Sequence, residues 1–142
     1  MVKNIVFSYQ KILRKEQDLE SIVNFGDKNL IQINKYLGNM VYNFSVPKNI
    51  GLNIFDLKFD SPLLAASFKS EKGLLDIWLK LGLGGVIFKT IMKDERKGNE
   101  RPRMQQVRIE RQQCIVNSLG LPGNGINSFA KDIINSPLWN HN

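Results

Sequence analysis

Hydrophobic positions in the first third of the chain recur with the period of an α-helix. Over residues 3–16 four apolar side chains fall on one helical face, namely Ile5, Tyr9, Ile12 and Leu13. A second set at mainly helical spacing covers residues 28–42, and Asp27 precedes it as a candidate cap. We therefore predict a helical N-terminal extension over residues 1–47, in which a polar loop at 17–27, broken at Gly26-Asp27, joins two short helices.

The pattern changes after the segment 46–51, whose proline and glycine predict a linker. The short apolar runs at 52–55 and 57–59 predict two strands that flank Asp56, and a turn follows at 60–62. This part of the chain therefore begins with a small hairpin.

A strand, a helix and a second strand follow the turn. The apolar runs at 63–66 and 84–88 predict two buried strands, and residues 71–81 between them carry a wide apolar helical face. A crossover of about twenty residues between two such strands is typical of a βαβ unit in a parallel sheet. We therefore assign residues 51–142 to an α/β region built of βα units.

The remainder of the chain predicts a long loop and one more helix. Residues 90–112 are too polar for a core helix, so we expect a loop with a hairpin near Arg103–Ile109. Apolar residues return at 126–134, which predicts a helix that the following proline ends.

Small or polar residues follow both strands of the βαβ unit. Ala66 and Ser67 follow the first strand, and Lys89 and Thr90 follow the second. In parallel α/β folds ligands bind at the carboxyl ends of the strands. An ammonium group at the end of a buried strand is costly to desolvate unless it meets an anion or several acceptors. Lys89 therefore predicts a ligand site that contains a cation.

A glycine-rich segment near residue 120 is a second candidate for binding. Asn117 offers both a donor and an acceptor, and Gly120, Gly123 and Gly125 allow a ligand to approach the backbone closely. A plain turn before the next helix explains the same composition equally well.

Composition limits the class of protein. A length of 142 residues, with 42% hydrophobic and 23% charged residues, fits one globular domain. Cys114 is the single cysteine, so it forms no internal disulfide, and a reducing, cytoplasmic setting is the default. No apolar run approaches the roughly 20 residues that span a bilayer, no secretory signal is visible, and no zinc-ligand spacing is present.

The net charge of +7 leaves three kinds of partner open: nucleic acid, an anionic membrane surface, and phosphorylated or carboxylate ligands. We expect no nucleic acid, because the chain lacks a helix-turn-helix pattern and an aromatic RNA-binding signature. The helix over 3–16 either packs on the domain or lies on an anionic membrane, which would place the protein at the inner face of that membrane.

Several motifs between about Leu52 and Ile134, taken in their order along the chain, resemble those of the dihydroorotate dehydrogenase family. That family has a strand ending in Ala-Ser-Gly or Ala-Ala-Gly, a strand ending in Thr-Lys or Gly-Thr, then Gly-Asn-x-x-Pro-Arg, then Asn-Ser-Met-Gly-Leu-Pro-Asn. The matching segments here are Ala65-Ala66-Ser67, Phe88-Lys89-Thr90, Gly98-Asn99-Glu100-Arg101-Pro102-Arg103 and Asn117-Ser118-Leu119-Gly120-Leu121-Pro122-Gly123. Each motif alone is weak, and their shared order and spacing are specific.

The resemblance implies the N-terminal portion of a (β/α)8 TIM barrel, preceded by the helical extension. It also implies an FMN enzyme that oxidises dihydroorotate to orotate in de novo pyrimidine biosynthesis. By position, Ala66, Ser67, Lys89 and Thr90 would contact the flavin, and Lys89 would also contact the substrate carboxylate. The implied substrate loop is Asn117, Ser118, Leu119, Gly120 and Leu121. A fixed cation favours both anionic orotate and reduced flavin.

The sequence departs from the family pattern at two positions and in length. Phe68 stands where the family has a glycine near the flavin, and Gly123 replaces an asparagine, although Asn124 is adjacent. A full barrel takes about 250 residues, so we expect an incomplete part of the enzyme, or a part that a second chain or self-association completes. We expect the family's catalytic base beyond residue 142, and we interpret Cys114 as structural.

Two further hypotheses and the electron acceptor stay open at this point. The half-barrel could be a catalytically inactive remnant or binding module, or the chain could be a basic protein associated with membrane or RNA. The lysine and the Asn-Ser-x-Gly-Leu-Pro motif resemble the family's soluble branch. The helical extension instead resembles its membrane branch, where such an extension forms a quinone tunnel. Quinone, fumarate and NAD are therefore all candidate acceptors.

Overall fold

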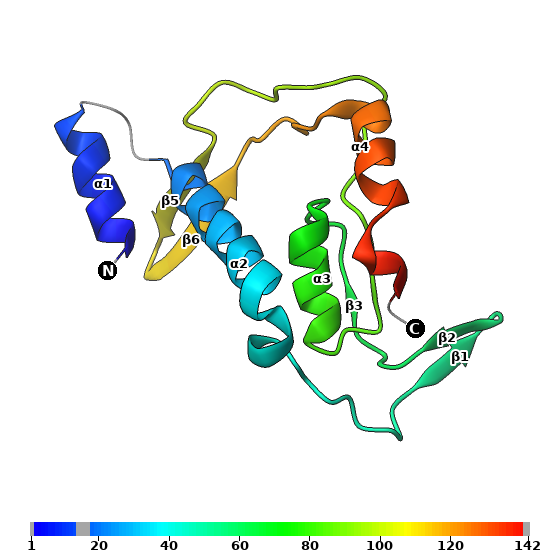
Figure 1. The fold of residues 1–142 in the computed structure, drawn as a ribbon. Coiled ribbons are helices and arrows are strands. Elements are labelled where there is room, and N and C mark those ends of the chain that lie inside the picture. The colour runs from blue at the N-terminus through cyan, green and yellow to red at the C-terminus, as the bar shows by residue number, and fades with distance from the viewer. Residues whose placement is uncertain (1, 14–17, 141–142) are drawn as a thin grey trace.

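The computed structural model describes residues 2–13 and 18–140 as a mixed α/β structure (Figure 1). The helices predicted near the N-terminus, at 71–81 and at 126–134 are all present. In chain order the elements are α1 (Val2–Ile12), α2 (Glu20–Val41), β1 (Leu52–Ile54), β2 (Leu57–Phe59), β3 (Leu64–Ala65), α3 (Lys72–Lys80), β4 (Gly85–Val86), β5 (Met104–Ile109), β6 (Gln112–Asn117), α4 (Gly125–Ile134) and the 3-10 turn η1 (Pro137–Asn140).

Helix α2 continues through Gly26 and Asp27, so the predicted break at these residues is wrong. A side chain at Gly26 would meet no atom within 4 Å, so the helix tolerates this glycine without needing it. Asp27 does not cap a helix, because it lies inside α2, where its carboxylate accepts a hydrogen bond from Lys69 Nζ at 2.5 Å. The helical pattern on both sides of these residues has therefore prevailed over the local signal for a turn.

The antiparallel pair β1–β2 confirms the predicted hairpin. Leu52 pairs with Phe59 and Ile54 pairs with Leu57. The two turn residues, Phe55 and Asp56, have φ values of +47° and +62°, as a two-residue hairpin turn that follows the strand twist requires. Figure 1 shows this hairpin projecting from the rest of the structure.

The parallel pair β3–β4, joined by α3, confirms the predicted βαβ unit. Leu64 pairs with Gly85, and Ala65 pairs with Val86. The prediction that both strands are buried is wrong, because Leu64 and Ile87 are about half exposed. Since this sheet has only two strands in the described part of the chain, much of its surface stays open.

A six-pair hairpin, β5–β6, separates β4 from α4. This hairpin is longer than the one predicted near residues 103–109. Its second strand extends to Asn117, which we had predicted to lie in the glycine-rich segment. The order β3, α3, β4, hairpin, α4 therefore consists of two βα units, and the hairpin is inserted in the second.

Helix α2 packs against α3 through apolar and polar contacts (Figure 1). Asn34 Nδ2 donates to Asp76 Oδ2 at 2.6 Å, and Lys80 Nζ donates to Asn34 Oδ1 at 3.0 Å. Lys80 also lies 2.8 Å from Asp76 Oδ2, so its charge compensates the carboxylate within α3. These contacts attach the predicted extension to the first βα unit.

The apolar core is small. The buried apolar side chains are Leu19, Leu74, Leu75, Ile77 and Leu138. The accessible surface is 11116 Å², whereas a compact monomer of 16.3 kDa exposes about 7,500 Å². Large apolar surfaces are therefore open. None of the described helices combines the length and apolar character needed to cross a membrane.

Candidate ligand-binding site at the strand ends

The segments that follow β3 and β4 lie side by side. The backbone N–H of Ile87 donates to the carbonyl of Ala65 at 3.1 Å, and the backbone N–H of Lys89 donates to the carbonyl of Lys69 at 3.0 Å. The parallel register therefore places the predicted flavin-contact residues of both strands along one edge.

Three side chains along this edge are small and accessible. Ala66, Ser67 and Thr90 are all exposed. Phe68 is exposed as well, and Lys69 Nζ lies 5.4 Å from its ring centroid. The carboxyl ends of β3 and β4 are therefore open to a ligand, and the small side chains there leave room for a flat ring system such as that of FMN, although Phe68 is a bulky neighbour. Among the described residues, no group of three His, Cys, Asp or Glu side chains could hold a metal ion.

Lys89 connects this edge to the glycine-rich segment. Its half-buried ammonium group donates to the carbonyl oxygen of Pro122 at 3.0 Å, 33 residues further along the chain. This bond occupies one of the three ammonium donors. The two sequence motifs that carry binding chemistry thus meet in space, although no short-range pattern joins them.

The glycine-rich segment at residues 117–123 is held by Arg96. We call it the substrate loop because it contains residues 117–121, to which the family resemblance assigns substrate binding. The backbone of Arg96 exchanges two hydrogen bonds of 2.8 Å with Gly123, and its Nε donates to the carbonyl of Gly120 at 2.6 Å. Gly120 and Leu121 have φ values of +72° and +53°, so the loop turns sharply at these two residues. The loop is therefore an ordered turn that Arg96 closes.

Asn99 holds the same loop from a second side. Its backbone N–H donates to the carbonyl of Leu119 at 3.1 Å, and its Nδ2 donates to the carbonyl of Ser118 at 2.7 Å. The backbone N–H of Ser118 donates to the carbonyl of Arg103 at 2.8 Å. Gly98 has a φ of +80° and lies so close to Leu119 that a Cβ there would overlap its carbonyl oxygen. These contacts explain why glycine and asparagine stand together at 98–99.

The five predicted residues of the substrate loop are placed differently from one another. Asn117 ends β6 opposite Met104 and is exposed, as are Ser118 and Leu121. Leu119 and Gly120 are half-buried. Their carbonyls are used by Asn99 and Arg96. The exposed side chains of Asn117 and Ser118 are therefore polar groups of this loop that a ligand can reach.

A cluster of ionic groups, which the sequence analysis missed, lies behind the loop. Arg103 donates from Nε and Nη2 to the two carboxylate oxygens of Glu20, both at 2.7 Å. Arg101 donates from Nε to Asp18 at 2.6 Å and from Nη2 to Ser21 at 2.9 Å. The hydrogen bond from Arg103 lowers the pKa of Glu20, and the carboxylate in turn raises the pKa of Arg103. Complementary charge at 18–20 and 101–103 was the available signal, but sequence alone does not show that these segments meet.

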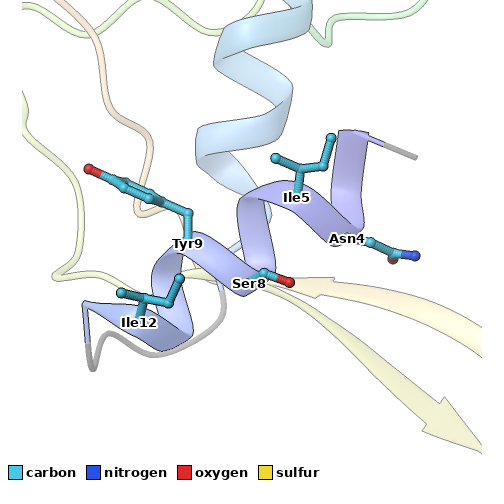
Figure 2. Close-up of a pocket in the computed structure, with 5 residues that line it drawn as sticks. All are labelled: Asn4, Ile5, Ser8, Tyr9 and Ile12. Carbon is cyan, nitrogen blue, oxygen red and sulfur yellow. The ribbon is translucent and has the colours of Figure 1, made fainter.

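An open apolar depression lies on α1, outside the strand-end site. It is lined by Asn4, Ile5, Ser8, Tyr9 and Ile12. Figure 2 shows Ile5, Tyr9 and Ile12 projecting to one side of the helix. All three apolar side chains are more than half exposed. The helical face predicted from the sequence therefore exists, and most of it is not covered by the described residues.

Comparison with known proteins identifies the family. A dihydroorotate dehydrogenase family model matches residues 49–139, which include both strand ends and the substrate loop. The chain belongs to the dihydroorotate dehydrogenase family. This result confirms the resemblance inferred from the ordered motifs.

Individual members of the dihydroorotate dehydrogenase family match over the same region. The catalytic subunit of the NAD(+)-type dihydroorotate dehydrogenase B of Pyrococcus horikoshii is 30% identical over 96 residues, which cover 63% of this chain and 29% of the relative. The quinone-type enzyme of Rhodopseudomonas palustris is 34% identical over 77 residues, which cover 54% of this chain and 21% of the relative. The matched region thus spans between a fifth and a third of these relatives, and both types of the family match.

Proposed function

We propose that these residues form part of an FMN and dihydroorotate site, and that the whole protein oxidises dihydroorotate to orotate in de novo pyrimidine biosynthesis. One observation carries the proposal: the Lys89 ammonium group at the end of the β3–β4 pair reaches the substrate loop at Pro122. A cation between two accessible binding elements suits a carboxylate ligand, because a charge-assisted hydrogen bond both orients and stabilises the anion.

Each predicted site residue has a role in this proposal. Lys89 binds the orotate carboxylate with the ammonium donors that Pro122 does not use. Asn117 presents its exposed amide to the polar edge of the pyrimidine ring. The backbone from Ser118 to Leu121 shapes the substrate pocket, and its turn is held in place by Arg96 and Asn99.

The flavin would lie along the edge formed by Ala66, Ser67 and Thr90. When bound, FMN supplies the acceptor for the hydride that leaves dihydroorotate. The chain's own contribution is to orient both molecules and to place the cation of Lys89 beside the negative charge of orotate and of reduced flavin. Cys114 pairs with Val107 in the middle of the β5–β6 hairpin, and we assign it no catalytic role.

The open apolar surface supports a larger assembly. We place the two βα units in a (β/α)8 barrel whose other units lie on the same polypeptide, on a second chain, or on another copy of this chain. Such units would cover the half-exposed Leu64 and Ile87 and the free edges of the β3–β4 pair. An inactive binding module with the same surfaces is the alternative, and it would bind ligand without turnover. The acceptor named for the relatives is NAD(+) in some and quinone in others, so both stay candidates here.

The apolar face of α1 supports a second, peripheral contact with an anionic membrane. Ile5, Tyr9 and Ile12 are exposed together, and Lys11 at the end of the helix is exposed beside them. An amphipathic helix with basic flanks binds at the headgroup boundary because its apolar face is buried there and its basic residues are attracted to anionic lipids. Co-sedimentation with phosphatidylserine vesicles, weakened by Ile5→Ser and by high salt, would support this contact, and equal sedimentation of the Ile5→Ser variant would refute it.

The decisive experiment for the proposed function is titration of the FMN-loaded protein with orotate, followed by flavin absorbance. Lys89→Ala should weaken orotate binding roughly 10- to 100-fold, because a hydrogen bond to a charged group contributes about 1.5–3 kcal/mol. Lys58→Ala is the matched control, since that lysine is 77% exposed on the β1–β2 hairpin. The affinity of this variant for orotate should stay unchanged. Equal orotate affinity in Lys89→Ala and the unsubstituted protein would overturn the assignment.

A further inference from the structure

Arg103 joins the start of helix α2 to the segment that precedes the substrate loop. Its Nε and Nη2 form the two-point contact with Glu20, and its Nη1 donates to the carbonyls of Lys97 and Asn99 at 2.7 Å and 2.9 Å. Both charged side chains are only 12% exposed. The planar guanidinium fork thus holds the carboxylate on one side and two carbonyls on the other, an arrangement that a lysine does not reproduce.

The segment held by Arg103 is the one that holds the substrate loop. Asn99 donates to the carbonyls of Ser118 and Leu119, and the backbone N–H of Ser118 donates to the carbonyl of Arg103. Gly120 packs closely against Asn99, because a Cβ at residue 120 would lie 2.8 Å from the backbone nitrogen of Asn99. A displacement of Arg103 is therefore passed to Ser118 and Leu119 through contacts that are already close.

The start of α2 is itself fixed by several groups. The backbone N–H of Leu19 donates to the carbonyl of Met104 at 2.9 Å, and the carboxylate of Asp18 accepts from the backbone N–H of Glu20 and from Arg101. Glu20 begins the helix, where the partial positive charge of the helix terminus favours its carboxylate. The far half of α2 packs on α3 through Asn34. Helix α2 thus extends from the β5–β6 hairpin, beside which it begins, to α3 of the first βα unit, as Figure 1 shows.

We propose that Glu20 and Arg103 are positioning residues: they couple the N-terminal helix α2 to the substrate loop and hold residues 117–121 in the conformation that binds the pyrimidine ring of the substrate. This inference rests on the proposed function for the identity of the ligand. The coupling itself rests only on contacts within the chain. A movement of α2 then changes the affinity for substrate, although no residue of α2 belongs to the binding site.

The test compares Glu20→Gln and Arg103→Lys with the control Asp27→Asn. Asp27 lies on the same helix and is ion-paired with Lys69 at 2.5 Å, with both side chains largely hidden, as in the Glu20–Arg103 pair. Its partner does not hold the 97–99 segment. The first readout is amide hydrogen exchange, measured by NMR at the backbone N–H of Asn99 and Ser118 in the purified protein.

Exchange at these two amides should be about tenfold faster in Glu20→Gln and in Arg103→Lys, and unchanged in Asp27→Asn. Exchange in the middle of the β5–β6 hairpin, at Cys114, should stay the same in all three variants, which separates local release of the loop from a loss of overall stability. Unchanged exchange at Asn99 and Ser118, or an equal rise at Cys114, would overturn the coupling.

The second readout is ligand affinity in the FMN-loaded protein. Both variants should bind orotate about tenfold more weakly while their affinity for FMN stays the same, because the flavin edge is joined to the loop by the bond from Lys89 to Pro122, which neither substitution removes. A merely structural role for the ion pair would weaken FMN and orotate binding together, and that result would overturn the proposal. If the unsubstituted protein binds no orotate, the proposed function fails, and the exchange experiment still decides whether the coupling exists.

Discussion

The close approach of Gly98 to the substrate loop makes Gly98→Ala the sharpest structural test of this site. The Cβ of alanine would overlap the Leu119 carbonyl oxygen and would lie 2.7 Å from Arg103 Nη1. The φ of +80° is itself unfavourable for alanine, at a cost of about 1–2 kcal/mol. Relief of the overlap would break the hydrogen bond from Asn99 to Leu119, which contributes about 1 kcal/mol. The free energy of unfolding should therefore fall by about 2–3 kcal/mol.

Gly123→Ala is the matched control for this substitution. Gly123 lies in the same loop, but a Cβ there would meet no atom within 4 Å, and its φ is not in the left-handed region. This variant should be neutral or more stable by up to about 1 kcal/mol, because alanine restricts the unfolded chain. Urea denaturation followed by circular dichroism measures both variants. Equal stability of Gly98→Ala and Gly123→Ala would show that the contact between 98–99 and the loop is not formed as described.

Two further outcomes follow from burial and charge. Leu75→Ala should lower the free energy of unfolding by about 2–5 kcal/mol, because Leu75 is fully buried, whereas Leu63→Ala on the exposed surface should change it by less than about 0.5 kcal/mol in the same urea experiment. The pKa of Glu20 is lowered in the folded state by its hydrogen bond from Arg103, so its contribution to stability is complete above the ordinary glutamate pKa of about 4.3 and is lost as pH falls through the lower folded value. Glu20→Gln should therefore lose less stability than the unsubstituted protein between about pH 5 and about pH 3, and parallel losses would contradict this reasoning.

Local patterns predicted the elements of the fold well where one short segment determines the result. The helical period of 71–81 and 126–134, the hairpin around Asp56 and the βαβ unit all depend on residues close in sequence, and all are present. The break expected at Gly26-Asp27 is absent, because a single glycine weakens a helix without ending it where the residues on both sides continue the helical pattern. The contact of Asp27 with Lys69, 42 residues away, could not be expected from a pattern within one helix.

Sequence patterns pointed to the candidate ligand-binding residues, but not to the contacts that hold those residues in place. Lys89 and the loop at 117–121 stood out because a cation after an apolar strand and a cluster of glycines are unusual in themselves. Their meeting at Pro122 follows from the parallel pairing of β3 and β4 and from the path of the β5–β6 hairpin. The pair Glu20–Arg103 joins residues 83 positions apart, so its role emerges only from the folded arrangement.

The way in which the loop is held has a consequence for how this sequence can vary. Four side chains fix the region, and every acceptor they use there is a main-chain carbonyl: Lys89 on Pro122, Arg96 on Gly120, Asn99 on Ser118 and Arg103 on Lys97. A carbonyl is present whatever side chain the acceptor residue carries. Substitutions at positions such as 97 and 118 should therefore be tolerated, whereas each donor must keep its type. A complete substitution scan of residues 89–123 should show this division, with intolerance concentrated at a few donors and at the glycines that the turns require.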